Sequence, residues 1–189
     1  MTKRGMSVAR VMFAIALLVI AAVMWRHVPT RMQSWAPITV EGPAGQRIVE
    51  DDLAVTVNRA ELARVVTTVD DGVVNELASK GVWLAISLTY ESLRIDQKPT
   101  LILRAAGRTF ESPLTDLRRQ AAPGIPRKGV VAFQLPDVPE DAALFVSRAA
   151  ADQWGNPLLA PLDTQIEVTI PLRGKDIHDA LDLSRMNQQ

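Results

Sequence analysis

Side chains that commonly carry out chemistry are scarce or scattered in this sequence. It contains no cysteine, which excludes disulfides, thiolate nucleophiles and cysteine metal ligands. Its two histidines, His27 and His178, lie at the end of an apolar run and in a polar tail, so a catalytic dyad or a metal pair is not expected. No serine lies in a Gly-x-Ser-x-Gly motif, and no glycine-rich phosphate loop is present. The sequence therefore indicates no catalytic residue, no metal site and no cofactor.

Carboxylates gather at two places, Glu50-Asp51-Asp52 and Asp70-Asp71 before Gly72. The first run could hold Ca²⁺ together with loop carbonyls, but neither run has the alternating spacing of a dedicated calcium loop. Solvated turns between strands are the favoured interpretation of both. A hydrolase would need two carboxylates across a cleft, and no particular pair is indicated.

The clearest candidate for binding is a basic loop. Arg118, Arg119, Arg127 and Lys128 bracket a proline- and glycine-containing segment that includes Ile125. Four cations around an apolar side chain could contact anionic lipid headgroups, an envelope polymer or the acidic face of a partner. The alternative is an ordinary solvated loop.

Two tryptophans are further candidates for binding. Trp154 lies in the tight turn Trp-Gly-Asn-Pro, where an aromatic ring more often covers a core than binds a sugar. Trp83 points away from the apolar face of its expected strand. It therefore either fills the second face of that strand or is exposed at a contact surface.

An apolar run near the N-terminus predicts a membrane anchor. Val11–Trp25 contains no charged residue, and its expected anchoring residues are Val11, Leu17, Ile20 and Trp25. The run covers only ~22 Å as a helix at ~1.5 Å per residue. Extension over residues 7–28 would match a bilayer core of ~30 Å.

A cleaved signal peptide and a buried helix are the alternatives to this anchor. Lys3, Arg4 and Arg10 suit a signal peptide, but Val23-Met24-Trp25 lacks the small residues of a cleavage site. A buried helix of a soluble protein would show a polar face, and this run shows none. The basic residues before the run favour a cytoplasmic N-terminus, a plasma-membrane location and an extracytoplasmic domain.

Composition and length fit one exported domain behind the anchor. The chain has 189 residues, and its 21 basic and 21 acidic side chains argue against a general nucleic-acid binder. We expect an N-terminus and anchor over residues 1–28, a Pro/Gly-rich linker over 29–45, a β-sandwich over 46–173, and a polar tail or short helix over 174–189.

Short runs with β-strand character dominate the domain. In 81–90, the residues Val82, Leu84, Ile86, Leu88 and Tyr90 form one continuous apolar face. Further strands are expected at 47–49, 53–59, 64–69 after a bulge, 100–104, 108–111, 129–135, 143–148 and 164–171. A short helical turn is expected over 115–120 and an amphipathic helix over 174–186. This pattern predicts a mainly β fold, an antiparallel β-sandwich.

The order of these motifs resembles a known bacterial group. Pro123-Gly124, Phe133-Gln134-Leu135-Pro136 and Leu144-Phe145-Val146 resemble the Pro-Gly loop and the two following strands of uncharacterised immunoglobulin-like extracytoplasmic domains. Those domains occur on membrane-anchored proteins and lipoproteins, mostly of Gram-positive bacteria. The resemblance covers residues 50–172 and implies an immunoglobulin-like sandwich outside the membrane, without implying an activity.

We therefore expect a non-catalytic, membrane-anchored binding or accessory module. Its partner is expected to be another envelope protein, for example in a transporter-associated complex. The alternative is a binder of envelope carbohydrate or lipid that uses Trp83, Trp154 and the basic loop. A hydrolase with an unrecognised carboxylate site is the least favoured reading.

Overall fold

The protein divides into two compact units, Met1–Ala36 and Pro37–Gln189. The structure is a computed structural model, and it describes residues 3–27, 38–70, 73–96, 98–117, 120–148 and 164–188. The first unit holds helix α1 (Lys3–His27), in which every side chain from Met12 to Met24, Leu17 and Ile20 included, is exposed. The side chains of Val11 and Trp25 lie outside the described set. Among the described residues, no helix combines the length and the apolar character that crossing a membrane requires.

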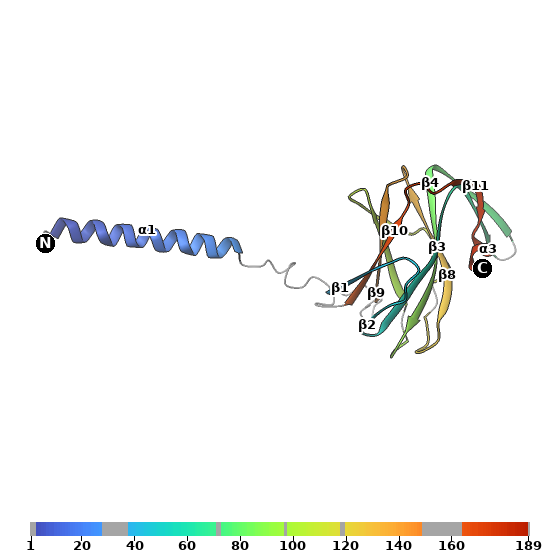
Figure 1. Ribbon diagram of the computed structural model, residues 1–189, viewed down its shortest axis with the longest axis horizontal. Coiled ribbons are helices and arrows are strands. Elements are labelled where there is room, and N and C mark those ends of the chain that lie inside the picture. The colour runs from blue at the N-terminus through green and yellow to red at the C-terminus, as the bar shows by residue number, and fades with distance from the viewer. Residues whose placement is uncertain are drawn as a thin grey trace. The chain divides into compact units, whose positions relative to one another are not determined.

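The second unit is mainly β and consists of two sheets (Figure 1). Its elements are β1 (Ile38–Pro43), β2 (Ile48–Glu50), β3 (Leu53–Asp70), β4 (Val73–Ser92), β5 (Pro99–Ala105), β6 (Arg108–Glu111), β7 (Leu114–Thr115), β8 (Arg127–Leu135), β9 (Asp141–Arg148), β10 (Thr164–Pro171), β11 (Ile177–Asp182) and α3 (Leu183–Gln188). One sheet has the order β1-β10-β9-β5-β6. The other has the order β11-β3-β4-β8-β7, with β2 paired to β3. The predicted mainly β fold, with two sheets that form a sandwich, is confirmed.

The core lies between the two sheets, and β4 supplies its centre. Side chains alternate across a strand, so Val82, Leu84, Ile86, Leu88 and Tyr90 all enter the core, as predicted. The hairpin of β5 and β6 also forms as predicted. Its turn residues Ala106 and Gly107 have φ values of 48° and 71°, a left-handed pair that matches the twist of the strands.

The outer face of the β4 sheet carries a second, smaller core. Trp83, Ala85, Val130 and Ala132 lie there with Ala63 and Val66, and they are covered by Leu183 and Met186 of α3. The strands β3, β4 and β8 are therefore buried on both faces where α3 covers them. This burial explains the unbroken apolar runs Val82–Ile86 in β4 and Val130–Phe133 in β8.

Strand directions place several chain segments at one end of the sandwich, which we call the base. The strands β1, β3, β5, β8 and β10 begin at the base, while β4 and β9 end there. The register shows this directly, because Leu53 pairs with Ser92, Tyr90 with Arg127, and Ile38 with Thr164. The connection 93–98 crosses the base from β4 to β5.

The prediction of a purely antiparallel sandwich is wrong at two edges. β1 runs parallel to β10, and β11 runs parallel to β3. Both pairings join segments far apart in the sequence, so neither can arise from a hairpin. Periodicity within one strand carries no information about such a partner.

The C-terminal segment also differs from the expected helix over 174–186. Residues 177–182 form β11, because the exposed edge of β3 offers backbone partners to this segment. The helix begins only at Leu183, where Asp182 Oδ1 accepts hydrogen bonds from the backbone N–H groups of Ser184 and Arg185. The helical spacing of Ile177, Ala180 and Leu181 was therefore misleading.

Two smaller expectations differ from the structure. Part of the segment expected as a linker over 29–45 is the strand β1, which pairs with β10. Of the segment 115–120, which was expected to form a short helical turn, Thr115 instead belongs to β7 and pairs with Val131, while residues 118–119 lie outside the described residues. In both places a tertiary strand partner overrides the local turn signal.

We expect Ile86→Ala to lower the free energy of unfolding by about 2–5 kcal/mol, because Ile86 is fully buried in the core. Denaturant unfolding followed by tryptophan fluorescence would measure this loss. The control is Val49→Ala on the exposed side of β2, which should change stability by no more than about 0.5 kcal/mol. Equal effects of the two substitutions would show that β4 is not the centre of the core.

Candidate functional site

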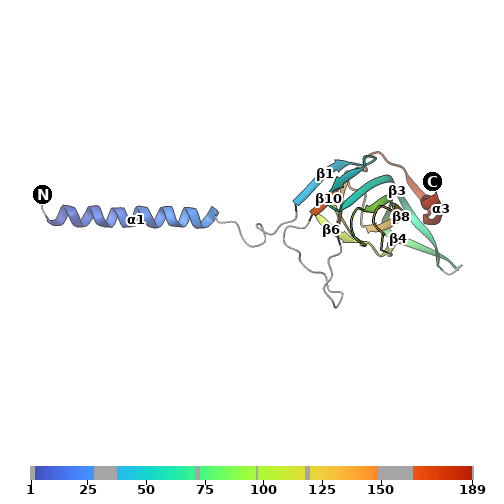
Figure 2. The same cartoon turned by 90° about the horizontal axis from the view of Figure 1, so that it is seen from below.

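The strands β3 and β4 continue beyond the sandwich as a paired arm (Figure 2). β8 pairs with β4 only from Val82 to Tyr90, whereas β3 pairs with β4 as far as Asp70 and Val73. We call residues 65–70 and 73–78 the arm. Among the described residues, no strand pairs with this part of β4 on the side away from β3.

The arm exposes apolar side chains. Val69, Val73 and Val74 are 52%, 60% and 61% exposed, and Leu77 lies close to them in sequence at 36%. Val69 and Val74 are paired opposite each other, so they share one face of the arm. Glu76, two residues after Val74 on the same strand, is exposed and adds a negative charge beside this apolar surface. The arm therefore has the composition of a contact surface rather than of a solvated hairpin.

Trp83 holds the arm against the sandwich. It is only 5% exposed, and its indole Nε1 donates a hydrogen bond to the carbonyl oxygen of Leu77 at 2.9 Å. Of the two positions predicted for Trp83, the filled second face of the strand is the correct one. Trp83 is therefore not available as an exposed ligand-binding aromatic.

The bend between arm and sandwich has a specific local structure. Trp83 pairs with Ala63, but Ala78 already pairs with Val65, so four residues of β4 oppose one residue of β3. Such a bulge bends the strand. Within the bulge, the backbone N–H of Gly81 donates to Ser79 Oγ at 3.0 Å, and a Cβ at this glycine would overlap the carbonyl oxygens of Leu135 and Pro136. Gln134 Nε2 also donates to Ser79 Oγ, at 3.1 Å.

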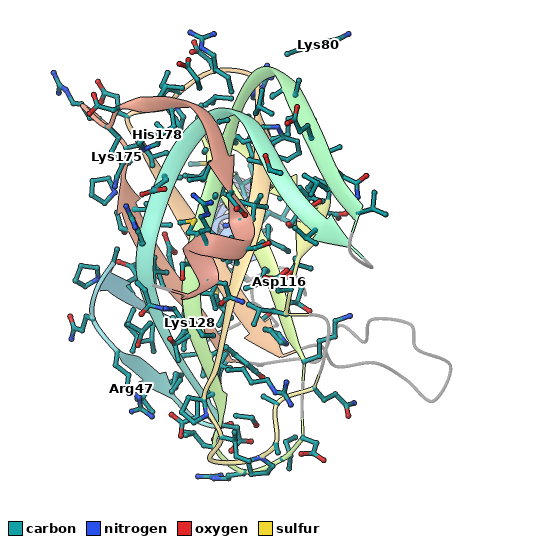
Figure 3. The ribbon with its side chains drawn as sticks, turned by 90° about the vertical axis from the view of Figure 1, so that its right-hand side faces the viewer. Arg47, Lys80, Asp116, Lys128, Lys175 and His178 are labelled. Carbon is teal, nitrogen blue, oxygen red and sulfur yellow. The ribbon has the colours of Figure 1, made fainter. Side chains whose placement is uncertain are left out.

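A cavity of 280 Å³ lies between the arm, the β7–β8 region and α3. Figure 3 labels Asp116, one of its lining residues. Its lining includes the hydroxyl residues Thr68, Thr115 and Ser184 and the carboxyl residue Asp116. Burial raises the pKa of Asp116 above its ordinary value of 3.8, and a hydrogen bond from the backbone of Val130 opposes this shift. Asn187 Nδ2 donates to Asp116 Oδ2 at 3.5 Å, so Asp116 links α3 to the sheet.

This cavity does not assemble a recognisable catalytic set. It offers one carboxylate and three hydroxyls, without a base beside a nucleophile. Throughout the part of the chain that the structure describes, no three His, Cys, Asp or Glu side chains come together as metal ligands would. We therefore treat Asp116 as a positioning contact for α3.

The predicted basic loop lies at the base. Ile125 is 57% exposed, and Arg127 and Lys128 are exposed as well. Arg118, Arg119 and Trp154 lie outside the described residues. The backbone N–H of Gly124 donates to the carbonyl oxygen of Ser92 at 2.7 Å, which joins this loop to the connection 93–98. That connection brings a second exposed isoleucine, Ile95, to the same end.

The acidic run before β3 takes part in an ion pair at the base. Arg94 Nε lies 3.1 Å from Asp52 Oδ1, and Arg94 Nη1 lies 3.6 Å from Asp51 Oδ1. The backbone N–H of Leu93 also donates to the carbonyl oxygen of Asp52 at 2.8 Å. These contacts tie the β2–β3 turn to the connection 93–98. The run is thus a turn with an arginine partner rather than a purely solvated one.

Sequence reasoning missed the arm and two of the exposed isoleucines at the base, Ile38 and Ile95. The signal for the arm was present, since Asp71-Gly72 lies between two β-branched runs and is a common hairpin dipeptide. No comparable signal marked Ile95, because a single isoleucine in a polar loop is unremarkable in a sequence. Only the fold places it at the same end as Ile125.

Comparison with known proteins assigns no family to the chain. No family model matches the chain, and no curated protein matches it. Among solved structures, the chain is similar to an uncharacterized beta-sandwich protein from Clostridium difficile 630, at 14% identity over 71% of this chain and 95% of that chain, with a TM-score of 0.39. This likeness carries no argument about function.

We expect Trp83→Phe to loosen the arm while leaving the sandwich folded. The substitution keeps an aromatic ring but removes the hydrogen bond to Leu77, which contributes about 0.5–1.5 kcal/mol. Hydrogen exchange of the amides in 73–78 should become faster, while the amides of β9 should be unchanged. Uniform acceleration across both regions would instead mean that Trp83 supports the whole domain.

Proposed function

We propose that this protein is a non-catalytic, membrane-anchored extracytoplasmic adaptor that binds an envelope protein through the arm. The observation that carries the proposal is the group of exposed valines on a hairpin that extends past its own sheet. Exposed apolar side chains on a projecting strand pair do little for folding, and they expose a protein to aggregation. Their presence favours a surface that a partner covers.

The composition of the arm defines the partner's chemistry. Val69 and Val74 form an apolar pair, and Asp70 and Glu76 lie beside them in sequence. We infer a partner surface with an apolar pocket edged by lysine or arginine side chains. Apolar contact would supply affinity, and the charges would supply orientation and faster association.

The attachment of the arm supports this role. The indole of Trp83 donates a hydrogen bond to the carbonyl oxygen of Leu77 in β4. On the β3 strand, β11 pairs from Leu62 to Thr67. Both strands of the arm are therefore held where they leave the sandwich. An arm held in one orientation loses less conformational entropy on binding than a free loop does. The arm therefore resembles a preorganised contact element.

The anchor and the immunoglobulin-like identity of the domain are parts of the same proposal. The anchor rests on the uncharged run Val11–Trp25 and on the arginines that flank it, Arg10 and Arg26. The immunoglobulin-like identity is supported by the order β10-β9-β5-β6, which corresponds to the G-F-C-C′ order of such domains. The long hairpin of β3 and β4 would then be an addition to the common pattern.

We expect the double substitution Val69→Thr and Val74→Thr to weaken partner binding by about tenfold, or about 1.4 kcal/mol. Threonine keeps the branched shape and the strand preference of valine but replaces an apolar methyl group with a hydroxyl. Full-length protein would be isolated in mild detergent from its native membrane, and the co-purifying protein would be quantified.

Val49→Thr is the matched control, because Val49 is also exposed on a strand but lies away from the arm. It should leave the co-purifying partner unchanged. The proposal fails if the double substitution retains the partner in full, or if both variants lose it equally.

We expect Leu17→Arg to reduce membrane integration of the full chain. An arginine at the middle of a spanning helix costs about 2.5–3.5 kcal/mol on insertion scales. Extraction of membranes with alkaline carbonate, followed by detection of the protein in pellet and supernatant, would measure the loss. Equal retention of the variant and the natural chain in the pellet would argue against a spanning helix.

A further inference from the structure

We propose that the base of the sandwich binds the surface of an anionic lipid bilayer. The proposal rests in part on the proposed function, since an anchored domain would work close to a membrane. The base itself is built from three segments that the sequence separates: the start of β1, the connection 93–98, and the segment 120–128 that leads into β8.

Exposed apolar side chains of the sandwich unit gather at its two ends. At the base they are Ile38, Ile95 and Ile125, which are 56%, 51% and 57% exposed. At the other end lie the valines and the leucine of the arm. The two other exposed large apolar side chains described in this unit are Val49, on β2 just before the β2–β3 turn, and Ile177, which is paired with Leu62 of β3. Three isoleucines at one end can enter the boundary between headgroups and acyl chains.

Cations accompany these isoleucines. Lys98, Arg127 and Lys128 are exposed, and within the described part of the chain they form no ion pair. Arg94 is also at the base, but it is balanced by Asp51 and Asp52. The sequence adds Arg118 and Arg119 just before the segment. Beside Asp51 and Asp52, the acids in the sequence of the segments at this end are Glu50, Asp96 and, between β9 and β10, Asp152 and Asp163. Cations near an anionic membrane surface are attracted to it, and the attraction weakens as salt screens the charges.

The path of the chain adds an independent argument. Ile38 is the first residue of the sandwich, and residues 1–37 precede it, so the N-terminal segment joins the sandwich at the base. The base is therefore the end of the sandwich at which the chain from the proposed anchor enters. The arm, at the opposite end, would remain free for a protein partner.

An interlocked loop structure makes the base a defined surface. The backbone N–H groups of Gly124 and Leu93 donate hydrogen bonds to the carbonyl oxygens of Ser92 and Asp52, respectively. Arg94 forms an ion pair with the side chain of Asp52. These contacts hold Ile125 and Ile95 on neighbouring, hydrogen-bonded loops. Binding to a bilayer surface requires apolar and cationic side chains held at one end of the domain, and it does not require a pocket.

The absence of cysteine from the chain allows a clean test with single labels. Full-length Ile125→Cys would carry an environment-sensitive fluorophore and be added to vesicles of phosphatidylcholine alone or with about 30% phosphatidylglycerol. We expect a blue-shifted emission in the anionic vesicles that diminishes as salt is raised. The same label at Asn75→Cys on the arm should not shift.

A matched pair of charge variants in the Ile125→Cys background identifies the cations. Arg127→Gln with Lys128→Gln should remove at least half of the shift. Arg64→Gln with Lys80→Gln, two exposed cations near the arm, should leave the shift intact. The proposal is overturned if Ile125→Cys shows no shift in anionic vesicles, if Asn75→Cys responds equally, or if both charge pairs have the same effect.

Flotation of the same samples separates this inference from the proposed anchor. Flotation without a shift at Ile125→Cys would leave the anchor standing and overturn the membrane-binding base. A shift in anionic vesicles, with no flotation on phosphatidylcholine alone, would support the base and count against the anchor. A shift that appears only when native envelope proteins are added would assign the base to a protein and overturn the lipid proposal.

Discussion

The structure depends on the burial of β4 on both of its faces. One face of Val82–Tyr90 supplies the core between the sheets, and the other holds Trp83 and Ala85 beneath α3. The pairing register of such a strand cannot shift by one residue, because the shift would move the large side chains of the inner core to the outer face and the side chains of the outer face into the inner core. It fixes β3 and β8 as neighbours, and through them the directions of all strands in the sheet.

This constraint also separates the two candidate surfaces. Because β3 and β4 are longer than β8, their excess length leaves the sandwich at one end as the arm. At the other end, the connection from β4 to β5 and the segment that leads into β8 carry Ile95, Ile125 and the cations of the base. A single pair of long strands thus has a projecting apolar end and a closed cationic end. The proposed adaptor, which would contact a membrane and a protein at once, needs this separation.

The small outer core gives the arm its orientation. Trp83, which is part of this core, contacts the arm through its hydrogen bond to the carbonyl oxygen of Leu77. Leu183 and Met186 of α3 cover the rest of the face on which Trp83 lies. Asp116 joins β7 to α3 through Asn187, at the cavity that lies beside Val69. The C-terminal segment is therefore part of the support of the arm. It contributes through β11 and α3 together, although its sequence has the spacing of one amphipathic helix.

The sequence by itself determined the mainly β class, the apolar face of β4, the β5–β6 hairpin and the exposure of Ile125, because alternation and turn residues act over a few neighbouring positions. It did not determine the parallel pairings of β1 and β11, since a strand's partner across the chain leaves no local pattern. The side on which Trp83 lies was also undecided, because both faces of β4 proved to be buried. Only the tertiary structure brought Ile95 to Ile125 and left the valines of the arm uncovered, since both results depend on which strands end where.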